Sequence, residues 1–233
     1  SRATNFIMLA LKLGLSLVST PRLGGWSPDD EASLQAWYQN QVGITLNGSD
    51  VSQWADSSTN GYDMSATGTE QPAYSGGVLT FVSADSNNLQ TTGQISLTGD
   101  FTIGFIFNPT ISAPGTLLGD NAGGSAGHEF IKYTSTTNLR LKIDNSTGNI
   151  PLDSGTFGDD YIVVTRVSNV LTLWYNGVAQ STTPTLAGTS DIDAIGVRET
   201  NQDFLDGTIE EIQIYSSSSA DLTSNINDRL AGL

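Results

Sequence analysis

The chain has 233 residues and carries 9 basic against 24 acidic side chains, a formal net charge of -15 at pH 7. This charge repels phosphate backbones and anionic membrane surfaces, which argues against a nucleic acid as partner. Cysteine is absent, which excludes disulfide frameworks and cysteine zinc sites, so the fold must be stabilised by its core.

The first predicted element is an apolar strand near the N-terminus. Leucine occupies every second position from Leu9 to Leu17, with small or polar residues at nearly all positions between. This alternation forms one apolar row on a pleated strand but would cover both sides of a helix. Because Pro21 and further breakers follow, we interpret residues 1–25 as an arm and linker that precede one domain spanning 26–233. The side chains expected to dock the arm on a partner are Phe6, Leu9, Leu11, Leu13, Leu15 and Leu17.

Two alternatives exist for this arm. A secretory signal peptide would explain Arg2 before an apolar stretch, but Lys12 interrupts that stretch and no small-x-small cleavage site follows it. The segment could instead be an ordinary strand of the domain's own sheet. A membrane span is excluded because the stretch is too short and contains a lysine.

The rest of the chain consists of short strand-like segments separated by turn residues. In residues 101–107, aromatic and aliphatic side chains alternate with Thr102, Gly104 and Ile106, which predicts one face in the core and one wetter face. Asn176-Gly177 is the favoured two-residue hairpin turn. The main predicted strands are 33–38, 78–82, 101–107, 139–143, 161–166, 170–175 and 209–215.

One helix is predicted, in residues 219–233. Leu222, Ile226 and Leu230 are spaced by four and form one apolar face, and Ala220-Asp221 could cap the helix. Many short strands with almost no helix indicate an all-β antiparallel sandwich.

Five local motifs, in the same order, resemble the concanavalin A-like jelly roll of laminin-G-type domains. They are the Trp54-Ala55-Asp56 loop in 51–63, the element 78–89, the strand 100–105, the Leu-Trp-Tyr-Asn-Gly hairpin at 173–177 and the closing strand 207–215. The match spans about 33–233. The resemblance implies a jelly-roll β-sandwich with a short C-terminal helix, preceded here by the extended arm.

An apolar N-terminal segment, a linker and then this domain also look like the organisation of structural proteins in tailed bacteriophages. That resemblance implies a non-enzymatic virion protein of the decoration or fibre type, displayed on the capsid or an appendage at the virion surface, with glycan adhesion as a further role. Its arm would join coat or appendage subunits, or sister subunits, by strand addition. The alternatives are a secreted or cell-surface, and so extracellular, carbohydrate-binding laminin-G-like module and, third, a glycoside hydrolase.

Catalysis finds little support in the sequence. Glycosidases need two carboxylates that face one scissile bond. Glu210 and Glu211 are the nearest candidates, but adjacent strand residues point to opposite faces. His128 is the only histidine and has no nucleophile motif beside it. We therefore expect no catalytic residue.

Calcium is the cofactor that the laminin-G resemblance implies, since such domains often hold this ion at one rim. Carboxylate and amide oxygens are suitable ligands, although the same residue types also form turns for backbone reasons alone. The candidates in the Trp54 loop and after residues 117–118 are Asp56, Asn60, Asp63, Asp120 and Asn121.

Glycan binding would require exposed aromatic rings. Trp26, Tyr62 and Tyr74 lie in predicted loops and are the candidates for stacking on a sugar. The remaining tryptophans, at 37, 54 and 174, stand in apolar strands and are predicted to be in the core.

Overall fold

The computed structural model describes residues 25–110, 114–121, 129–199 and 201–233. The predicted docking arm, with Phe6 and the leucines from Leu9 to Leu17, and His128 lie outside these residues. The arm therefore stays a prediction.

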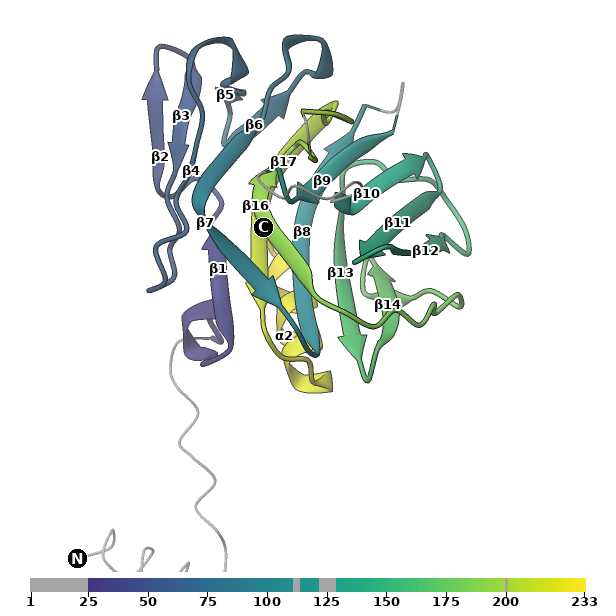
Figure 1. Ribbon diagram of the computed structural model, residues 1–233. Coiled ribbons are helices and arrows are strands. Elements are labelled where there is room, and N and C mark those ends of the chain that lie inside the picture. The colour runs from purple at the N-terminus through teal and green to yellow at the C-terminus, as the bar shows by residue number, and fades with distance from the viewer. Residues whose placement is uncertain (1–24, 111–113, 122–128, 200) are drawn as a thin grey trace, which may run out of the picture.

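The described strands form two antiparallel layers that pack face to face (Figure 1). We call the first the helix-side sheet. In it β17 is central: β8 pairs along one edge, and β6 and β1 pair with successive parts of the other edge. Its strands are β1 (Leu34–Tyr38), β6 (Val78–Phe81), β17 (Gly207–Tyr215), β8 (Phe101–Pro109), β13 (Asp160–Val167), β14 (Val170–Tyr175) and β15 (Val178–Ala179).

The second layer, the opposite sheet, runs from β12 at one edge to β2 at the other. In spatial order its strands are β12 (Ser146–Pro151), β11 (Asn138–Ile143), β10 (Glu129–Ser135), β9 (Gly115–Gly119), β16 (Ser190–Ile195), β7 (Leu89–Leu97), β4 (Met64–Ser65), β3 (Asp50–Trp54) and β2 (Ile44–Asn47). The short β5 (Ala73–Ser75) pairs with both β3 and β6 and so connects the two layers. Three short 3-10 helices, η1 (Pro28–Asp30), η2 (Gly68–Glu70) and η3 (Ser83–Asp85), lie in the connections.

The inner core lies between the two sheets and follows from strand alternation. Phe101, Ile103, Phe105 and Phe107 of β8 are buried in it, as are alternate residues of β11 such as Leu141. The predicted inward faces of these strands are therefore confirmed.

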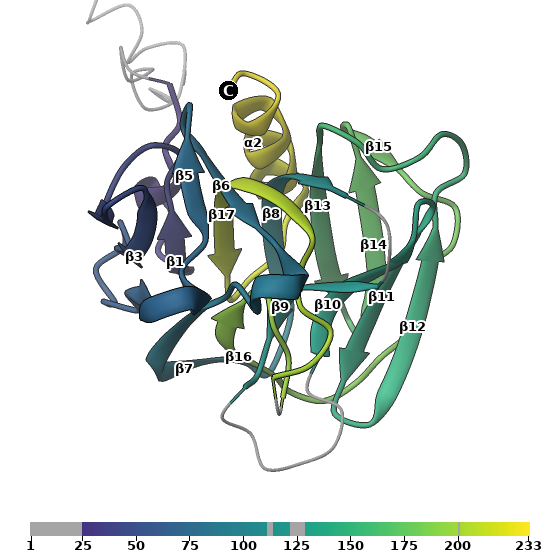
Figure 2. The same ribbon diagram turned by 90° about the horizontal axis from the view of Figure 1, so that it is seen from above.

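The other face of β8 is not the wetter face that the sequence predicted. Helix α2 (Ala220–Leu230) packs on it, on the side away from β9–β12 (Figures 1 and 2). Gly104 makes this approach possible, because a Cβ there would lie 2.6 Å from Cγ2 of Ile226. Leu222, Ile226 and Leu230 form the buried face of the helix, as predicted.

The turn and helix-cap residues of the sequence predicted one hairpin and the start of the helix to within one residue. Asn176 and Gly177 have φ values of 47° and 77° between β14 and β15, which confirms the predicted hairpin. The helix is capped by Ser219, whose side chain accepts a hydrogen bond from the Leu222 amide at 3.0 Å, one residue earlier than predicted. Among the described residues, no helix is long and apolar enough to cross a membrane.

Candidate functional site

Two adjoining cavities lie on the outer face of the helix-side sheet, along one flank and the C-terminal end of α2. Their volumes are about 240 Å³ and 300 Å³, and Tyr161 and Ala231 border both. We call the two together the helix groove. The first cavity is lined by Ile106, Asp159, Asp160, Tyr161, Glu210, Leu230, Ala231 and Leu233. The second is lined by Tyr161, Trp174, Gly177, Ala220, Thr223, Ser224, Asn227, Asp228 and Ala231.

A β-bulge in β17 brings Glu210 to this face. Ile209 pairs with Phe107 and Glu211 pairs with Ile106, so Glu210 is an extra residue opposite the β8 ladder. The extra residue interrupts the alternation, and both glutamates contact Asn40: its side-chain amide donates to Glu210 and its backbone amide donates to Glu211, each at 3.1 Å. The prediction that the two carboxylates point to opposite faces was therefore wrong.

Glu211 anchors the helix. Its fully buried carboxylate accepts five hydrogen bonds, two of them from Arg229 of α2 at 2.6 and 3.0 Å. The other donors are the Trp37 indole, the Asn40 amide and the Gln213 side chain. The Arg229 guanidinium also lies 4.9 Å from the centre of the Trp37 ring. This carboxylate is fully engaged and is not free to act on a ligand.

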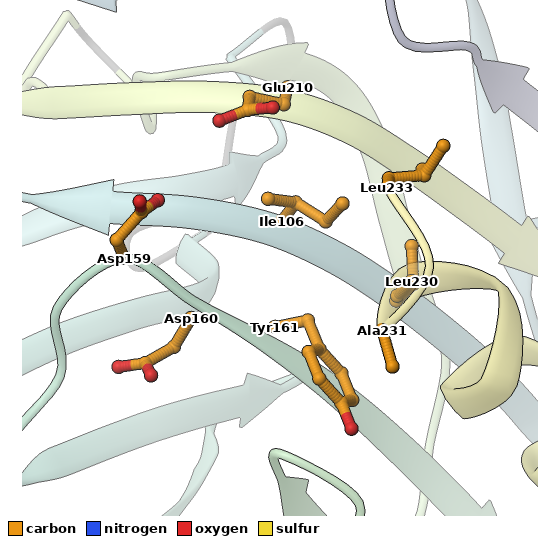
Figure 3. A pocket seen from close by; sticks show the side chains of 8 residues that line it. All are labelled: Ile106, Asp159, Asp160, Tyr161, Glu210, Leu230, Ala231 and Leu233. Atoms are coloured by element: carbon orange, nitrogen blue, oxygen red, sulfur yellow. The ribbon is translucent and has the colours of Figure 1, made fainter.

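Glu210 and Asp159 are the carboxylates that remain available in the first cavity. They lie on either side of Ile106 (Figure 3). Partial burial raises the pKa of Glu210, and the nearby charge of Asp159 raises it further, while the hydrogen bond from Asn40 lowers it. The cavity therefore concentrates negative charge.

Asp160 has a structural role at the start of β13. Its carboxylate accepts hydrogen bonds from the Gly158 amide at 2.7 Å, the Tyr175 hydroxyl at 2.6 Å and the Asn176 side chain at 2.7 Å. Burial, and then the hydrogen bond from the Tyr175 hydroxyl to Asp160, raises the pKa of Tyr175 to about 12. These contacts hold the β14–β15 hairpin against β13 and position Tyr161.

The second cavity combines two aromatic rings with two buried polar atoms. Val163 pairs with Trp174, so Tyr161 and Trp174 are diagonal neighbours on one face of the sheet, with roughly 7–8 Å between backbones. The Trp174 Nε1–H and the Asn227 Oδ1 are buried without a hydrogen-bond partner in the described part of the chain. The Asn227 amide nitrogen donates to the Thr223 carbonyl at 2.8 Å, which fixes which way the amide points.

Sequence reasoning missed Trp174 as a site residue because it was predicted to be in the core. Leu171 and Leu173 of the same strand do face the inner core, so residues 172 and 174 must face outward. Trp174 is only partly buried and packs against the cluster beneath α2. The alternation within residues 170–175 was the signal that could have identified it.

The Trp54 loop residues brace the loop against β1. The Asp56 carboxylate accepts hydrogen bonds from the Trp37 and Tyr62 amides and from the amide and hydroxyl of Ser58. Asp63 accepts from the Gln53 side chain and the Asp56 amide, and the Asn60 side chain donates to the Leu34 and Gln35 carbonyls. Trp54 itself is fully buried.

The second pair of calcium candidates lies at the end of β9. Asp120 is 2% exposed, and the backbone amide of Asn121 donates a hydrogen bond to the Asp193 carboxylate at 2.6 Å. Among the described residues, no group of three or more acidic or histidine side chains could hold a metal ion. Calcium binding by these residues stays a prediction.

The three aromatic residues predicted to bind glycan are not part of the helix groove. Trp26 is partly buried against the cluster beneath α2, and its indole donates to Glu31 at 2.8 Å. Tyr62 and Tyr74 are partly buried against the inner core instead. Trp26 therefore packs against a different cluster from the two tyrosines.

Comparison with protein-family models matches residues 81–221 to a laminin G-type model described as the concanavalin A-like lectin/glucanases superfamily. These residues are more than half of the chain and include β8, β13, β14 and β17. A comparison with curated proteins finds no match.

Similar solved structures have low sequence identity and so show the fold alone. Domain 4 of AbnA, a GH43 extracellular arabinanase from Geobacillus stearothermophilus in complex with arabinotriose, has a TM-score of 0.55 at 17% identity, covering 85% of this chain and 98% of that domain. The W1252A mutant of HCR D/C VPI 5995 has a TM-score of 0.56 at 16% identity, covering 88% and 53%. Trypanosoma rangeli sialidase in complex with sialic acid has 0.53 at 15% identity, covering 97% and 38%. The chain thus spans about half of the second structure and less than half of the third.

Proposed function

Because this chain belongs to the concanavalin A-like lectin/glucanases superfamily, we propose that it is a carbohydrate-binding domain whose glycan binds in the helix groove. The observation that carries the proposal is the second cavity, which Tyr161, Trp174 and Asn227 line together. The indole Nε1–H of Trp174 and the Oδ1 of Asn227 are buried without a hydrogen-bond partner among the described residues. Ligand sites combine apolar and aromatic walls with a few polar groups that fix orientation. A sugar presents this same combination of C–H faces and hydroxyls.

A hydroxyl group suits the two buried polar atoms. It can accept a hydrogen bond from the Trp174 indole and donate one to the Asn227 oxygen. Both atoms are covered in the structure, so a ligand can reach them only if side chains of the groove move. Satisfying two buried polar groups is favourable because leaving them unpaired is costly.

Two of the similar structures hold a sugar, which supports the proposal by analogy of fold. One is the AbnA domain with arabinotriose and the other is the sialidase with sialic acid. The AbnA domain is matched over nearly its whole length, and it is a single domain of a larger enzyme. We therefore propose that this chain binds glycan as a module.

We propose binding rather than hydrolysis. Glu211 would complete a catalytic carboxylate pair with Glu210, but its carboxylate already accepts hydrogen bonds from Arg229 and three other residues. The remaining pair, Glu210 and Asp159, includes an exposed carboxylate at the mouth of the cavity. Incubation with oligosaccharides and measurement of released reducing ends tests this point; hydrolysis that is lost in Glu210→Gln would contradict it.

The proposal is tested by glycan-array screening followed by calorimetry on the best ligand. We expect Trp174→Ala to weaken binding at least tenfold, because it removes both a ring and a donor. Trp26→Ala is the matched control, since Trp26 is also partly buried but does not line the groove. Equal binding by Trp174→Ala and the native chain would contradict the groove, and a loss confined to Trp26→Ala would favour the sequence-predicted aromatics.

The virion role depends on residues 6–17, which lie outside the described residues. We propose it as a second function because the apolar row of Leu9 to Leu17 needs a partner to cover it. Co-sedimentation of the full chain, and of a chain starting at Trp26, with stripped virus particles tests it. Attachment of the full chain alone supports the role, and equal behaviour of both chains contradicts it.

A further inference from the structure

We infer that the helix groove selects neutral glycans and rejects acidic ones, an inference that rests on the proposed function. The first observation is the charge of the groove. Among the residues that the structure describes, four carboxylates line its two cavities, and neither a lysine nor an arginine does. They belong to Asp159, Asp160, Glu210 and Asp228.

The arginine of helix α2 does not offset this charge. Arg229 is on the same helix as Asp228, but its guanidinium is bound to the buried Glu211 and stacks on Trp37. The ion pairs found among the described residues include neither Asp159 nor Glu210. A carboxylate or sulfate on a ligand would therefore enter an uncompensated negative field.

The second observation is independent of charge and concerns hydrogen bonding. The Asn227 Oδ1 needs a donor, because its own amide nitrogen is already used on the Thr223 carbonyl. An ionised carboxylate is acceptor-only, so it can satisfy the Trp174 indole but not Asn227. A sugar hydroxyl can satisfy both. The two buried atoms therefore favour a hydroxyl over a carboxylate at this position, which agrees with the effect of the charge.

The ring geometry fits a neutral sugar as well. Tyr161 and Trp174 are diagonal neighbours on adjacent strands. Burial, and then the charge of Asp228, raises the pKa of the Tyr161 hydroxyl. A ligand that spans both cavities passes Tyr161 and reaches Glu210 and Asp159. Carboxylates bind neutral sugars well, because each oxygen accepts hydrogen bonds from hydroxyls.

The test uses the full chain and matched ligand pairs. A printed array with neutral, sialylated, uronic-acid and sulfated glycans identifies the best neutral ligand, and calorimetry compares it with the derivative that carries one added carboxylate. We expect the neutral member to bind at least tenfold more tightly. In Asp159→Asn/Glu210→Gln, the acidic member should gain affinity severalfold more than the neutral member does.

The control variant Glu70→Gln/Asp85→Asn removes the same two charges from exposed positions on η2 and η3 outside the groove. It should leave both affinities within about threefold, which separates a local effect from net charge. Equal or tighter binding of acidic glycans, with loss in Trp174→Ala, would overturn the inference and leave the proposed function standing. Absence of glycan binding of either kind would overturn both.

Discussion

The two buried clusters of this domain differ in composition and in what they support. The inner core, between the sheets, is an apolar cluster with residues such as Phe105, Leu141 and Ile212 contributed by both layers. The cluster beneath α2 is smaller and lies beside a fully buried carboxylate, Glu211, with its partner Arg229. The inner core holds the sandwich together, and the outer cluster holds one helix in one position.

This difference explains where a binding groove can form. Apolar packing between sheets tolerates many arrangements of similar side chains. A buried ion pair is directional and stabilises only one placement of the helix. Helix α2 borders both cavities of the groove, and the Glu211–Arg229 contact fixes the position of this helix. The contact therefore also determines the shape of the groove.

The largest effect is expected from breaking that contact. Arg229→Met leaves the Glu211 carboxylate buried without its counter-charge, which should lower the free energy of unfolding by about 3 kcal/mol or more. Urea unfolding measures the loss. The double variant Glu211→Gln/Arg229→Met should recover more than half of it, since the amide is neutral; no recovery would mean that packing of the arginine stem, not charge, is lost.

The burial of the inner core can be tested through the hydroxyl of Tyr133, which belongs to it. Burial raises the pKa of Tyr133, from its ordinary value near 10, to about 12. The unfolded chain then loses this proton first as pH rises. The stability that the protonated Tyr133 hydroxyl contributes is fully present below pH 10. The free energy of unfolding should fall by up to about 1.4 kcal/mol per pH unit between pH 10 and 12.

Denaturant unfolding at several alkaline pH values, with phenolate absorbance, checks this expectation. Tyr133→Phe loses the hydrogen bond to the Asp206 carbonyl at all pH values, but its alkaline slope should be shallower than that of the native chain. An unchanged slope would show that Tyr133 does not titrate with unfolding.

The close approach of α2 to β8 predicts an intermediate effect. Gly104→Ala places a Cβ 2.6 Å from Cγ2 of Ile226, so overpacking should cost about 1–3 kcal/mol. Thermal unfolding measures it. Gly99→Ala is the control, because nothing lies within 4 Å of a Cβ there. Since the two side chains compete for one space, Gly104→Ala in an Ile226→Ala background should cost clearly less, and strict additivity would contradict the contact.

The smallest effect concerns the groove itself. The pKa of Glu210 is raised by partial burial and by Asp159, so its ionised form is slightly less stable in the folded chain. Stability contributed by the protonated form is present at low pH and is lost as pH rises through the folded pKa. Glu210→Gln should therefore raise stability at pH 7 by less than about 0.5 kcal/mol, since the group is only partly buried and solvent screens its charge. A decrease would show that its hydrogen bond with Asn40 outweighs the repulsion.

Much of the fold follows from local patterns. The alternation in 101–107 and 139–143 predicted strands and their inward faces, Asn176-Gly177 predicted a hairpin, and the spacing of Leu222, Ile226 and Leu230 predicted the buried face of the helix. Shorter strands such as β2 and β4 were not identified. Their sequences are short or lack clean alternation, so pairing with neighbours decides their structure.

The candidate site could not be read in the same way. It draws on β8, β13, β14, β17 and α2, which are distant in sequence, and its key glutamate is exposed by a bulge that pairing with β8 creates. The sequence by itself determined the strand faces, the hairpin and the amphipathic helix, because each depends on neighbouring residues in the chain. The tertiary structure decided which sheet face the helix covers, which way Glu210 points and which rings share a cavity, because these depend on contacts between remote segments.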